Sequence, residues 1–242
     1  MKNNIKTVLI SGSSRGVGFE IAKLFNSYNY NIILVSRNFS DSYLKSFKKP
    51  EKIFLISKAI QDNDLIKNIN GIIQEKILDT PSIIINNSGG PDPVTPLQIK
   101  EKQLKDYFNS GLLGFINIIK EYAPFMKKKN WGRIINIGST ISKEPSAIMA
   151  ISATIRSGLS AYSKALSLDL AENGITVNTI NMGGVMTERI KDLFSKIAIK
   201  EGGKIGSQEI RLYNLIWKNT VESLMEKAIY ESITAQITAP EK

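Results

Sequence analysis

The sequence contains no cysteine and no histidine. These absences exclude disulfide bonds, thiol nucleophiles, zinc sites built from Cys and His, and every mechanism that uses a histidine base. Proton transfer would have to use Tyr, Lys, Asp, Glu, water or the substrate itself. We expect no metal site.

Long apolar runs are also missing. No stretch reaches the roughly 18 apolar residues that a membrane-spanning helix needs. The N-terminus lacks the layout of a signal peptide, because a strand-like run begins within a few residues of Met1. We therefore expect a soluble, cytoplasmic protein with no membrane partner.

Acidic residues are outnumbered, since 32 Lys and Arg face 22 Asp and Glu and leave a formal net charge of +10. Such an excess can indicate nucleic-acid binding. Here the lysines are scattered, apart from a short cluster at residues 127–129, and no basic stripe with interleaved aromatic residues occurs. The pattern favours a solvated basic surface and no nucleic-acid partner.

Strand-like and helix-like segments alternate along the chain. Continuous apolar runs predict parallel strands covered on both faces, at residues 6–11, 31–36, 52–57, 82–86, 133–138 and 175–180. Helical patterns occupy residues 17–28, 62–77, 101–129 and 152–173. The alternation predicts an α/β fold with a doubly wound, Rossmann-like parallel sheet flanked by helices.

The 242 residues, 42% of them hydrophobic, suit one α/β domain over residues 1–242. Its core would span residues 5–190, followed by an atypical, shortened part at 191–242. In that part, residues 188–230 suggest helices with loops, and residues 233–239 suggest a short final strand.

Residues 11–18 read SGSSRGVG and lie between the first apolar run and a helical pattern. Glycines at positions 12, 16 and 18 are typical of a dinucleotide site, because glycine adopts positive φ and lets the backbone approach a pyrophosphate at a helix N-terminus. The alternative is a tight strand-to-helix turn that binds no ligand.

Several motifs in order resemble the short-chain dehydrogenase/reductase family over roughly residues 5–190. SGSSRGVG is similar to the family's TGxxxGxG cofactor loop, and NNSGG at 86–90 is similar to its NNAG segment after the fourth strand. GRIINIGS at 132–139 resembles the fifth strand, which ends in the active-site serine. ITVNTINMGG at 175–184 resembles the sixth strand and the loop beside the nicotinamide.

The resemblance assigns cofactor contacts to loop residues that follow several of the strands. They are Gly12, Ser14, Arg15, Gly16, Val17, Gly18, Arg37, Asn87, Ser88, Gly89, Gly183, Val185 and Thr187. NAD-specific members place an Asp after the second strand to hold the ribose 2′-hydroxyl, whereas this chain has Ser-Arg-Asn at 36–38. Arg15 and Arg37 favour a 2′-phosphate, and hence NADP(H) over NAD; the alternative is two solvated arginines.

One feature of the cofactor site departs from the family. After the third strand the family carries an Asp against the adenine, and here Ala59 aligns with it, with Asp62 as a late substitute.

The catalytic residues depart further. Family reductases use a Tyr proton donor, a Lys four residues later, a Ser that holds the carbonyl oxygen, and an Asn from a preceding helix. Ser139 matches the serine, but the spacing puts Ser152 at the Tyr position and Arg156 at the Lys position. Gly111 aligns with the Asn, although Asn109 is close.

Tyr162 is a poor substitute for the missing tyrosine. Leu166, not a lysine, follows it by four residues, and Tyr162 lies ten residues too far along the helix and on a different face.

Ser152 and Arg156 are spaced i, i+4 and share a helix face. Arg156 is no acid near neutral pH, but it could hold a cofactor ribose or phosphate, bind a substrate carboxylate, or stabilise a developing alkoxide. Protons could come from water or from Lys143, for which the alternative is a solvated loop lysine. GGPDP at 89–93 and SKEP at 142–145 also resemble a family subset that lacks the Tyr-Lys pair.

These residues lead to two hypotheses. The first is an NADP(H)-dependent oxidoreductase that reduces a carbonyl or enone of a small or acyl-carrier-linked substrate by a non-standard site of Ser139, Ser152 and Arg156. The second is a catalytically inactive NADP(H)-binding homologue that acts as a sensor or partner subunit. The resemblance also implies a homo-oligomer, dimer or tetramer, although the family's Asp-Gly-Gly ending is absent and the helices at 101–129 and 152–173 could pair as a dimer.

Overall fold

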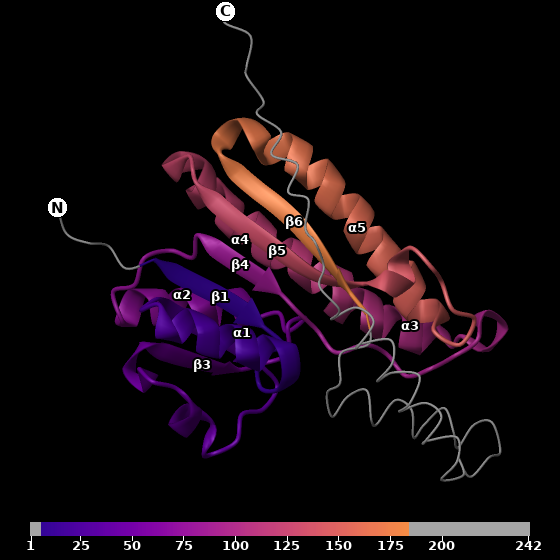
Figure 1. Ribbon diagram of the computed structural model, residues 1–242, viewed down its shortest axis with the longest axis horizontal. Helices are drawn as coiled ribbons and strands as arrows, with labels where there is room; N and C mark the ends of the chain where they lie inside the picture. The colour runs from indigo at the N-terminus through magenta and orange to yellow at the C-terminus, as the bar shows by residue number, and fades with distance from the viewer. Residues whose placement is uncertain (1–5, 184–242) are drawn as a thin grey trace, which may run out of the picture. The chain divides into compact units, whose positions relative to one another are not determined.

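The computed structural model of the protein describes residues 6–183, and within them six strands form one parallel sheet. The sheet order is β3-β2-β1-β4-β5-β6 (Figure 1). The strands are β1 (Thr7–Ser11), β2 (Asn31–Ser36), β3 (Ile53–Ser57), β4 (Ile83–Asn86), β5 (Gly132–Ser139) and β6 (Ile175–Met182). The predicted doubly wound α/β sheet is confirmed, with every strand near its expected bounds.

Helices flank this sheet (Figure 1). The α-helices are α1 (Gly16–Ser27), α2 (Leu65–Glu75), α3 (Glu101–Phe108), α4 (Gly114–Lys129) and α5 (Ala150–Leu170). Short 3₁₀ turns are η1 (Tyr43–Ser46), η2 (Pro50–Lys52), η3 (Pro96–Gln98), η5 (Thr140–Ser142) and η6 (Ala171–Asn173), whereas η4 (Asn109–Leu113) is a π-helical turn.

Three predicted helices differ in extent from the observed ones. The pattern at 101–129 is not one α-helix, because η4 separates α3 from α4. The pattern at 62–77 begins only at Leu65, because Asp62 closes a turn with Ala59 through its backbone N–H (3.1 Å) and its carboxylate (2.8 Å). The pattern at 152–173 starts earlier, at Ala150, and α5 gives way to η6 after Leu170.

The strands are continuously apolar because both faces of the sheet are buried. Leu9, Ile33 and Ile84 point to one face, where buried side chains of α2, α4 and α5 cover them. Their neighbours in the strands point to the other face, where side chains of α1 and η1 pack. Burial of alternate residues on opposite faces explains why the runs lack a polar–apolar alternation.

The strand order places a switch point between β1 and β4. The chain builds outward from β1 to β3, and then returns to the opposite side of β1 to begin β4. In open parallel sheets, ligands bind beyond the carboxyl ends of the strands at such a point. The segments that follow β1, β4 and β5 therefore meet at the edge where a site is expected.

Several predictions fall on residues beyond those that the structure describes. They concern Val185, Thr187, the helices at 188–230, the strand at 233–239 and the organisation of residues 191–242. The single-domain organisation of the whole chain stays a prediction. Between residues 6 and 183, no helix combines the length and the apolar character that crossing a membrane requires.

A chain of buried polar side chains links β4, β5 and α5. Asn86 donates from Nδ2 to Asn136 Oδ1 (2.8 Å), and Asn136 donates in turn to Ser163 Oγ (2.8 Å). Ser163 donates to the Leu159 carbonyl in its own helix (2.7 Å). Both asparagines are fully buried, so each bond replaces one that water would make in the unfolded chain.

We expect the substitution Asn136→Ala to lower the free energy of unfolding by about 1–3 kcal/mol, because it leaves the Asn86 amide buried without its acceptor. Urea denaturation would measure this loss as a lower midpoint, with an unchanged dependence of the unfolding free energy on urea concentration. Asn117→Ala, on the exposed side of α4, is the matched control and should change stability by less than about 0.5 kcal/mol. Equal midpoints for the two variants would contradict the prediction.

Candidate functional site

The loop between β1 and α1 has a backbone that only glycine accommodates. Gly12 has φ +58° and Gly16 has φ +60°. A Cβ atom at Gly12 would lie 2.5 Å from the Asn87 carbonyl oxygen, and one at Gly18 would lie 2.4 Å from the Gly12 carbonyl oxygen. Side chains at these positions would separate the loop from β4 and from α1.

Hydrogen bonds fasten this loop to the start of the segment after β4. Ser11 Oγ donates to the Asn87 carbonyl (2.9 Å) and accepts from the Asn87 backbone N–H (3.0 Å). Asn87 Nδ2 donates to the Gly12 carbonyl (2.8 Å). Asn87 therefore holds the loop against the end of β4 through its backbone and its side-chain amide.

The other side of the loop is fastened to β2 and η1. Tyr43 donates its hydroxyl to the Ser13 carbonyl (2.7 Å), and burial raises the pKa of Tyr43 above its ordinary value, so the hydroxyl stays protonated. Ser36 Oγ donates to Ser14 Oγ (2.8 Å). The loop is thus held in one conformation before any ligand arrives.

Helix α1 begins at this loop without a side-chain cap. Arg15 is the N-cap residue, makes no capping hydrogen bond, and is followed by a first turn that has no acidic residue. The first backbone N–H groups of a helix have no partner within it, and they carry partial positive charge. This end of α1 can therefore accept a phosphate.

Arg15 and Arg37 leave the backbone at neighbouring points. Each directly follows one of the two serines, Ser14 and Ser36, whose hydroxyls are 2.8 Å apart. Both arginines are exposed, and neither forms a salt bridge with another residue in the described part of the chain. Two cations thus lie beside the loop.

Asp62, the expected substitute for an adenine-binding Asp, has its carboxylate bonded to the Ala59 backbone N–H (2.8 Å). The carboxylate therefore shapes the turn that follows β3.

Arg156 is buried between the ends of β4 and β5. Its Nη1 donates to the Ile137 carbonyl in β5, and its Nη2 donates to the Ser88 carbonyl after β4 (3.1 Å). The residue is only 5% exposed. No carboxylate among residues 6–183 pairs with it, so its charge is balanced there by carbonyl dipoles alone.

The residues expected to be catalytic are only partly gathered. Ser152 lies one turn before Arg156 on α5 and is 6% exposed, so the i, i+4 pair does share a buried face. Ser139 ends β5, two residues beyond the carbonyl that Arg156 binds. Lys143 is exposed at the C-cap of η5, and no side-chain contact links it to the other three.

The Ser139 hydroxyl accepts one hydrogen bond and can still donate one. Its Oγ accepts from the Ile141 backbone N–H (3.4 Å), which caps η5. Ser142 Oγ donates to the Ser139 carbonyl (2.8 Å). The turn after β5 therefore orients Ser139 while leaving it able to donate.

The segment after β4 is joined to the start of α5. Val94 donates its backbone N–H to the Ile148 carbonyl (2.8 Å), and Ala150 donates to the Val94 carbonyl (3.3 Å). Gly89 and the residues up to Pro93 thus bridge the loop-binding residue Asn87 and the helix that carries Ser152.

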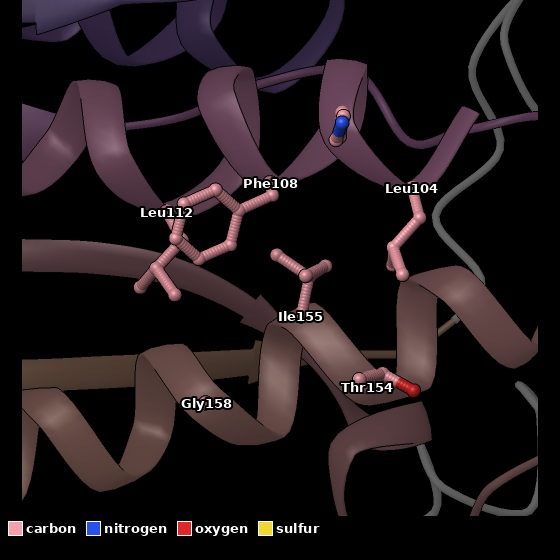
Figure 2. A pocket seen from close by; sticks show the side chains of 7 residues that line it. Leu104, Phe108, Leu112, Thr154, Ile155 and Gly158 are labelled. Carbon is pink, nitrogen blue, oxygen red and sulfur yellow. The ribbon is translucent and has the colours of Figure 1, made fainter. Parts of the chain in front are cut away.

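An apolar groove lies elsewhere, between α3 and η4 on one side and α5 on the other. Figure 2 shows Phe108, Leu112 and Ile155 around it. None of the residues predicted for catalysis or cofactor binding lines this groove.

A family model described as short chain dehydrogenase matches residues 6–198. The chain belongs to this family. Among curated relatives of this short-chain dehydrogenase are the 3-oxoacyl-[acyl-carrier-protein] reductase FabG of Vibrio cholerae and the NADPH-dependent reductase BacG of Bacillus subtilis. FabG is 28% identical over 201 residues, or 78% of this chain and 77% of FabG. BacG is 28% identical over 204 residues, or 81% of this chain and 77% of BacG.

Solved structures agree with the fold of this short-chain dehydrogenase. YwfH, described as an NADPH-dependent reductase involved in bacilysin biosynthesis, matches with a TM-score of 0.72 at 26% identity, covering 81% of this chain and 79% of YwfH. ElxO with NADP bound matches at 0.71 and 22% identity, covering 82% and 79%. A Brucella melitensis 3-ketoacyl-(acyl-carrier-protein) reductase complexed with NADH matches at 0.71 and 18% identity, covering 79% and 81%.

The buried hydroxyl groups without a hydrogen-bond partner among the described residues include those of Ser88, whose carbonyl Arg156 binds, and Tyr107, whose ring the Arg156 guanidinium faces. Ser88 was expected as a cofactor contact, whereas Tyr107 was not anticipated from the sequence. The signal that could have revealed it is the spacing to Gly111, one helical turn later on the same face.

The glycines of the loop provide a stability test. We expect Gly18→Ala to lower the free energy of unfolding by about 1–3 kcal/mol, since the new methyl group must displace backbone rather than a flexible side chain. Gly71→Ala in the exposed part of α2, where a Cβ meets nothing within 4 Å, is the control. It should stabilise by up to about 1 kcal/mol. Thermal and urea unfolding measure both, and a neutral Gly18→Ala would refute the close approach.

Proposed function

We propose that this protein is an NADP(H)-dependent oxidoreductase that reduces a carbonyl or an enone of a small or acyl-carrier-linked substrate. One observation carries the proposal. A glycine-rich loop suited to bind phosphate lies at the switch point of the sheet. Ser139 and the buried Arg156 lie near the carboxyl ends of β4 and β5. Anion binding and oxygen polarisation are thus available along one edge.

The loop fits a dinucleotide. The space that Cβ atoms would fill at Gly12 and Gly18 is kept free by glycine, and α1 begins there with uncapped N–H groups. A pyrophosphate could accept hydrogen bonds from these groups, next to Ser14, Gly16 and Val17. Asn87, Ser88 and Gly89 would border the adjoining ribose. Gly183, which follows β6, belongs to the proposed set, as do Val185 and Thr187, which lie outside the described residues.

The preference for NADP(H) rests on charge. Arg15 and Arg37 are exposed and free of carboxylate partners within the described chain, and guanidinium groups bind phosphate through charged, forked hydrogen bonds. The names of BacG and of the ElxO complex mention NADPH or NADP, whereas the Brucella structure contains NADH. The fold is therefore compatible with either cofactor, and the two arginines carry the preference.

When bound, the reduced cofactor would supply a hydride. Ser139 would donate a hydrogen bond from its hydroxyl to the substrate oxygen, while its Oγ accepts from the Ile141 backbone N–H. Arg156 would stabilise negative charge that develops on this oxygen, acting by its field because two of its nitrogens are bonded to backbone carbonyls. Ser152 would orient the oxygen or a water molecule, and Lys143, exposed beyond η5, would exchange protons with solvent.

Arg37→Ala should weaken NADPH binding about 10- to 100-fold while leaving NADH binding nearly unchanged, because only NADPH has the 2′-phosphate that the guanidinium would bind. Arg15→Ala should act in the same direction. Quenching or enhancement of the cofactor's own fluorescence measures both dissociation constants.

Lys23→Ala is the control for loss of a positive charge near the site, because Lys23 lies on α1 and is paired with Glu20 at 3.2 Å. It should bind both cofactors as the unmodified protein does. An equal loss of NADPH and NADH affinity in Arg37→Ala would contradict the proposed phosphate contact.

Ser139→Ala should lower kcat about 100-fold or more with little change in the dissociation constant of NADPH, because a donor to the reacting oxygen acts mainly in the transition state. Arg156→Lys keeps the charge but loses the fork between two carbonyls, so it should lower both kcat and thermal stability. The assay follows NADPH oxidation with ethyl acetoacetate and with 2-cyclohexenone. Unchanged turnover in both variants would contradict the proposed site.

One observation favours a second function, that of a catalytically inactive NADP(H)-binding sensor or partner subunit. Arg156, at the position of the family's catalytic Lys, is bonded to two backbone carbonyls, as a structural residue would be. This alternative predicts tight NADPH binding, no NADPH oxidation across a broad carbonyl panel, and a change in association state when NADPH is added. We keep a homo-oligomer and a cytoplasmic location as further proposals.

A further inference from the structure

The hydroxyl of Tyr107 is buried and has no hydrogen-bond partner in the part of the chain that the structure describes. The residue is 4% exposed and lies near the end of α3. Buried tyrosine hydroxyls normally find a partner, because leaving one without any costs free energy. The Tyr107 oxygen is one of six buried side-chain polar atoms without a partner in the described part of the chain and the only one on a tyrosine, and each such group calls for an explanation.

The ring of Tyr107 occupies room that another side chain would need. Gly111 lies one turn later, inside the π-helical turn η4, and a Cβ atom there would come within 3.1 Å of Tyr107 Cζ. Gly111 aligns with the position at which the family resemblance expects an Asn. The absence of that side chain is what lets the ring lie against the helix. Single π-helical turns of this kind occur frequently at functional sites.

The ring also adjoins the cation of the candidate site. The Arg156 guanidinium lies over it, 5.8 Å from the ring centroid. The same guanidinium holds the Ser88 carbonyl after β4 and the Ile137 carbonyl in β5. Tyr107 therefore lies beside the cation that joins β5 to the segment after β4.

The ring of Tyr107 belongs to an apolar cluster. Its cluster consists of Val94 from the segment after β4, Ile151 and Ile155 from α5, and the partly buried Ile99, Leu104 and Leu112. The Arg156 guanidinium faces this ring, so the hydroxyl and the cation belong to one neighbourhood.

We propose that Tyr107 donates the proton to the substrate oxygen, in place of the tyrosine that the chain lacks at position 152. This role rests on the proposed reductase function. The substrate carbonyl gains a hydride at carbon from NADPH and a proton at oxygen from Tyr107. One carbonyl, one NADPH and one proton thus become one alcohol and one NADP⁺, and a proton taken up from solvent restores the Tyr107 hydroxyl.

Two other tyrosines, Tyr162 of α5 and Tyr122 of α4, lack this combination of an unpartnered hydroxyl and a contact with Arg156. Tyr162 packs against the hydrophobic cluster under α5, and burial, followed by the charge of Asp169, raises its pKa. Tyr122 donates its hydroxyl to Asn70 Oδ1 (3.0 Å) in the interior. Neither contacts Arg156 in the structure.

The first test compares Tyr107→Phe with Tyr162→Phe, each of which removes one hydroxyl and keeps the ring. With NADPH and either ethyl acetoacetate or 2-cyclohexenone, kcat of Tyr107→Phe should fall about 100-fold, and its NADPH dissociation constant should stay within twofold. Tyr162→Phe should keep both kcat and the NADPH dissociation constant of the wild-type protein.

The second test needs no turnover. 3-Fluorotyrosine is incorporated at position 107, and in a parallel sample at position 122, and the ¹⁹F resonance is followed while NADPH is added. The label at 107 should shift with the cofactor's binding curve, and the label at 122 should not. Gly111→Ala should move the label at 107 even without NADPH, because the new methyl group displaces the ring.

The outcomes separate the donor role from the reductase function. Wild-type turnover with an equally active Tyr107→Phe would overturn the donor role and leave the function intact. An unmoved label at 107 on NADPH saturation would also overturn it. A protein that reduces no probe but shifts the label would overturn the reductase function, and the donor role with it, while keeping Tyr107 at the cofactor site.

Discussion

The hydrogen bonds between Asn87 and the loop that follows β1 join the two halves of the sheet at the edge where the site forms. They operate at the switch point, where β1 and β4 are neighbours although more than seventy residues separate them in sequence. Because Gly12 has no Cβ atom, the two backbones come close enough for these bonds. The start of α1 is thereby oriented toward the same edge as the ends of β4 and β5, and every proposed role depends on that orientation.

Arg156 is the second constraint on this edge. A guanidinium group binds two carbonyls in a fixed fork, so it holds the residues after β4 and the residues of β5 at a constant separation. A lysine, with a compact ammonium on a flexible stem, would hold them less rigidly. Within residues 6–183 the charge of Arg156 is balanced by carbonyl dipoles and by no carboxylate, so the buried cation also provides a positive field. One side chain thus has both a structural and an electrostatic role, and its chemistry follows from its packing.

The region around η4 shows how one missing side chain changes its neighbourhood. Gly111 leaves a space beside α5, and the ring of Tyr107 fills it and comes to lie against Arg156. The hydroxyl of Ser152 is too short to reach as far as a tyrosine at that position would. The tyrosine of α3 is the ring that approaches the cation, and the proposed proton donor therefore comes from α3 instead of α5.

Much of the architecture was predictable from sequence, because strands buried on both faces must be apolar throughout and loops with positive φ favour glycine. The six strands and the glycine loop after β1 follow from these local rules. The π-helical turn η4 and the late start of α2 were missed, since they depend on a one-residue shift of hydrogen bonding and on the Asp62 carboxylate closing a turn.

By itself, the sequence determined the fold class, the family resemblance and the absence of a Tyr-Lys pair at positions 152 and 156, because each depends on residue type and spacing. Only the tertiary structure decided that Arg156 joins β5 to the segment after β4, and that the Tyr107 hydroxyl is buried with no partner in the described part of the chain. These facts depend on which side chains meet across helices and strands that lie far apart along the chain. Burial, charge and hydrogen bonding at such contacts have no signature in a local pattern.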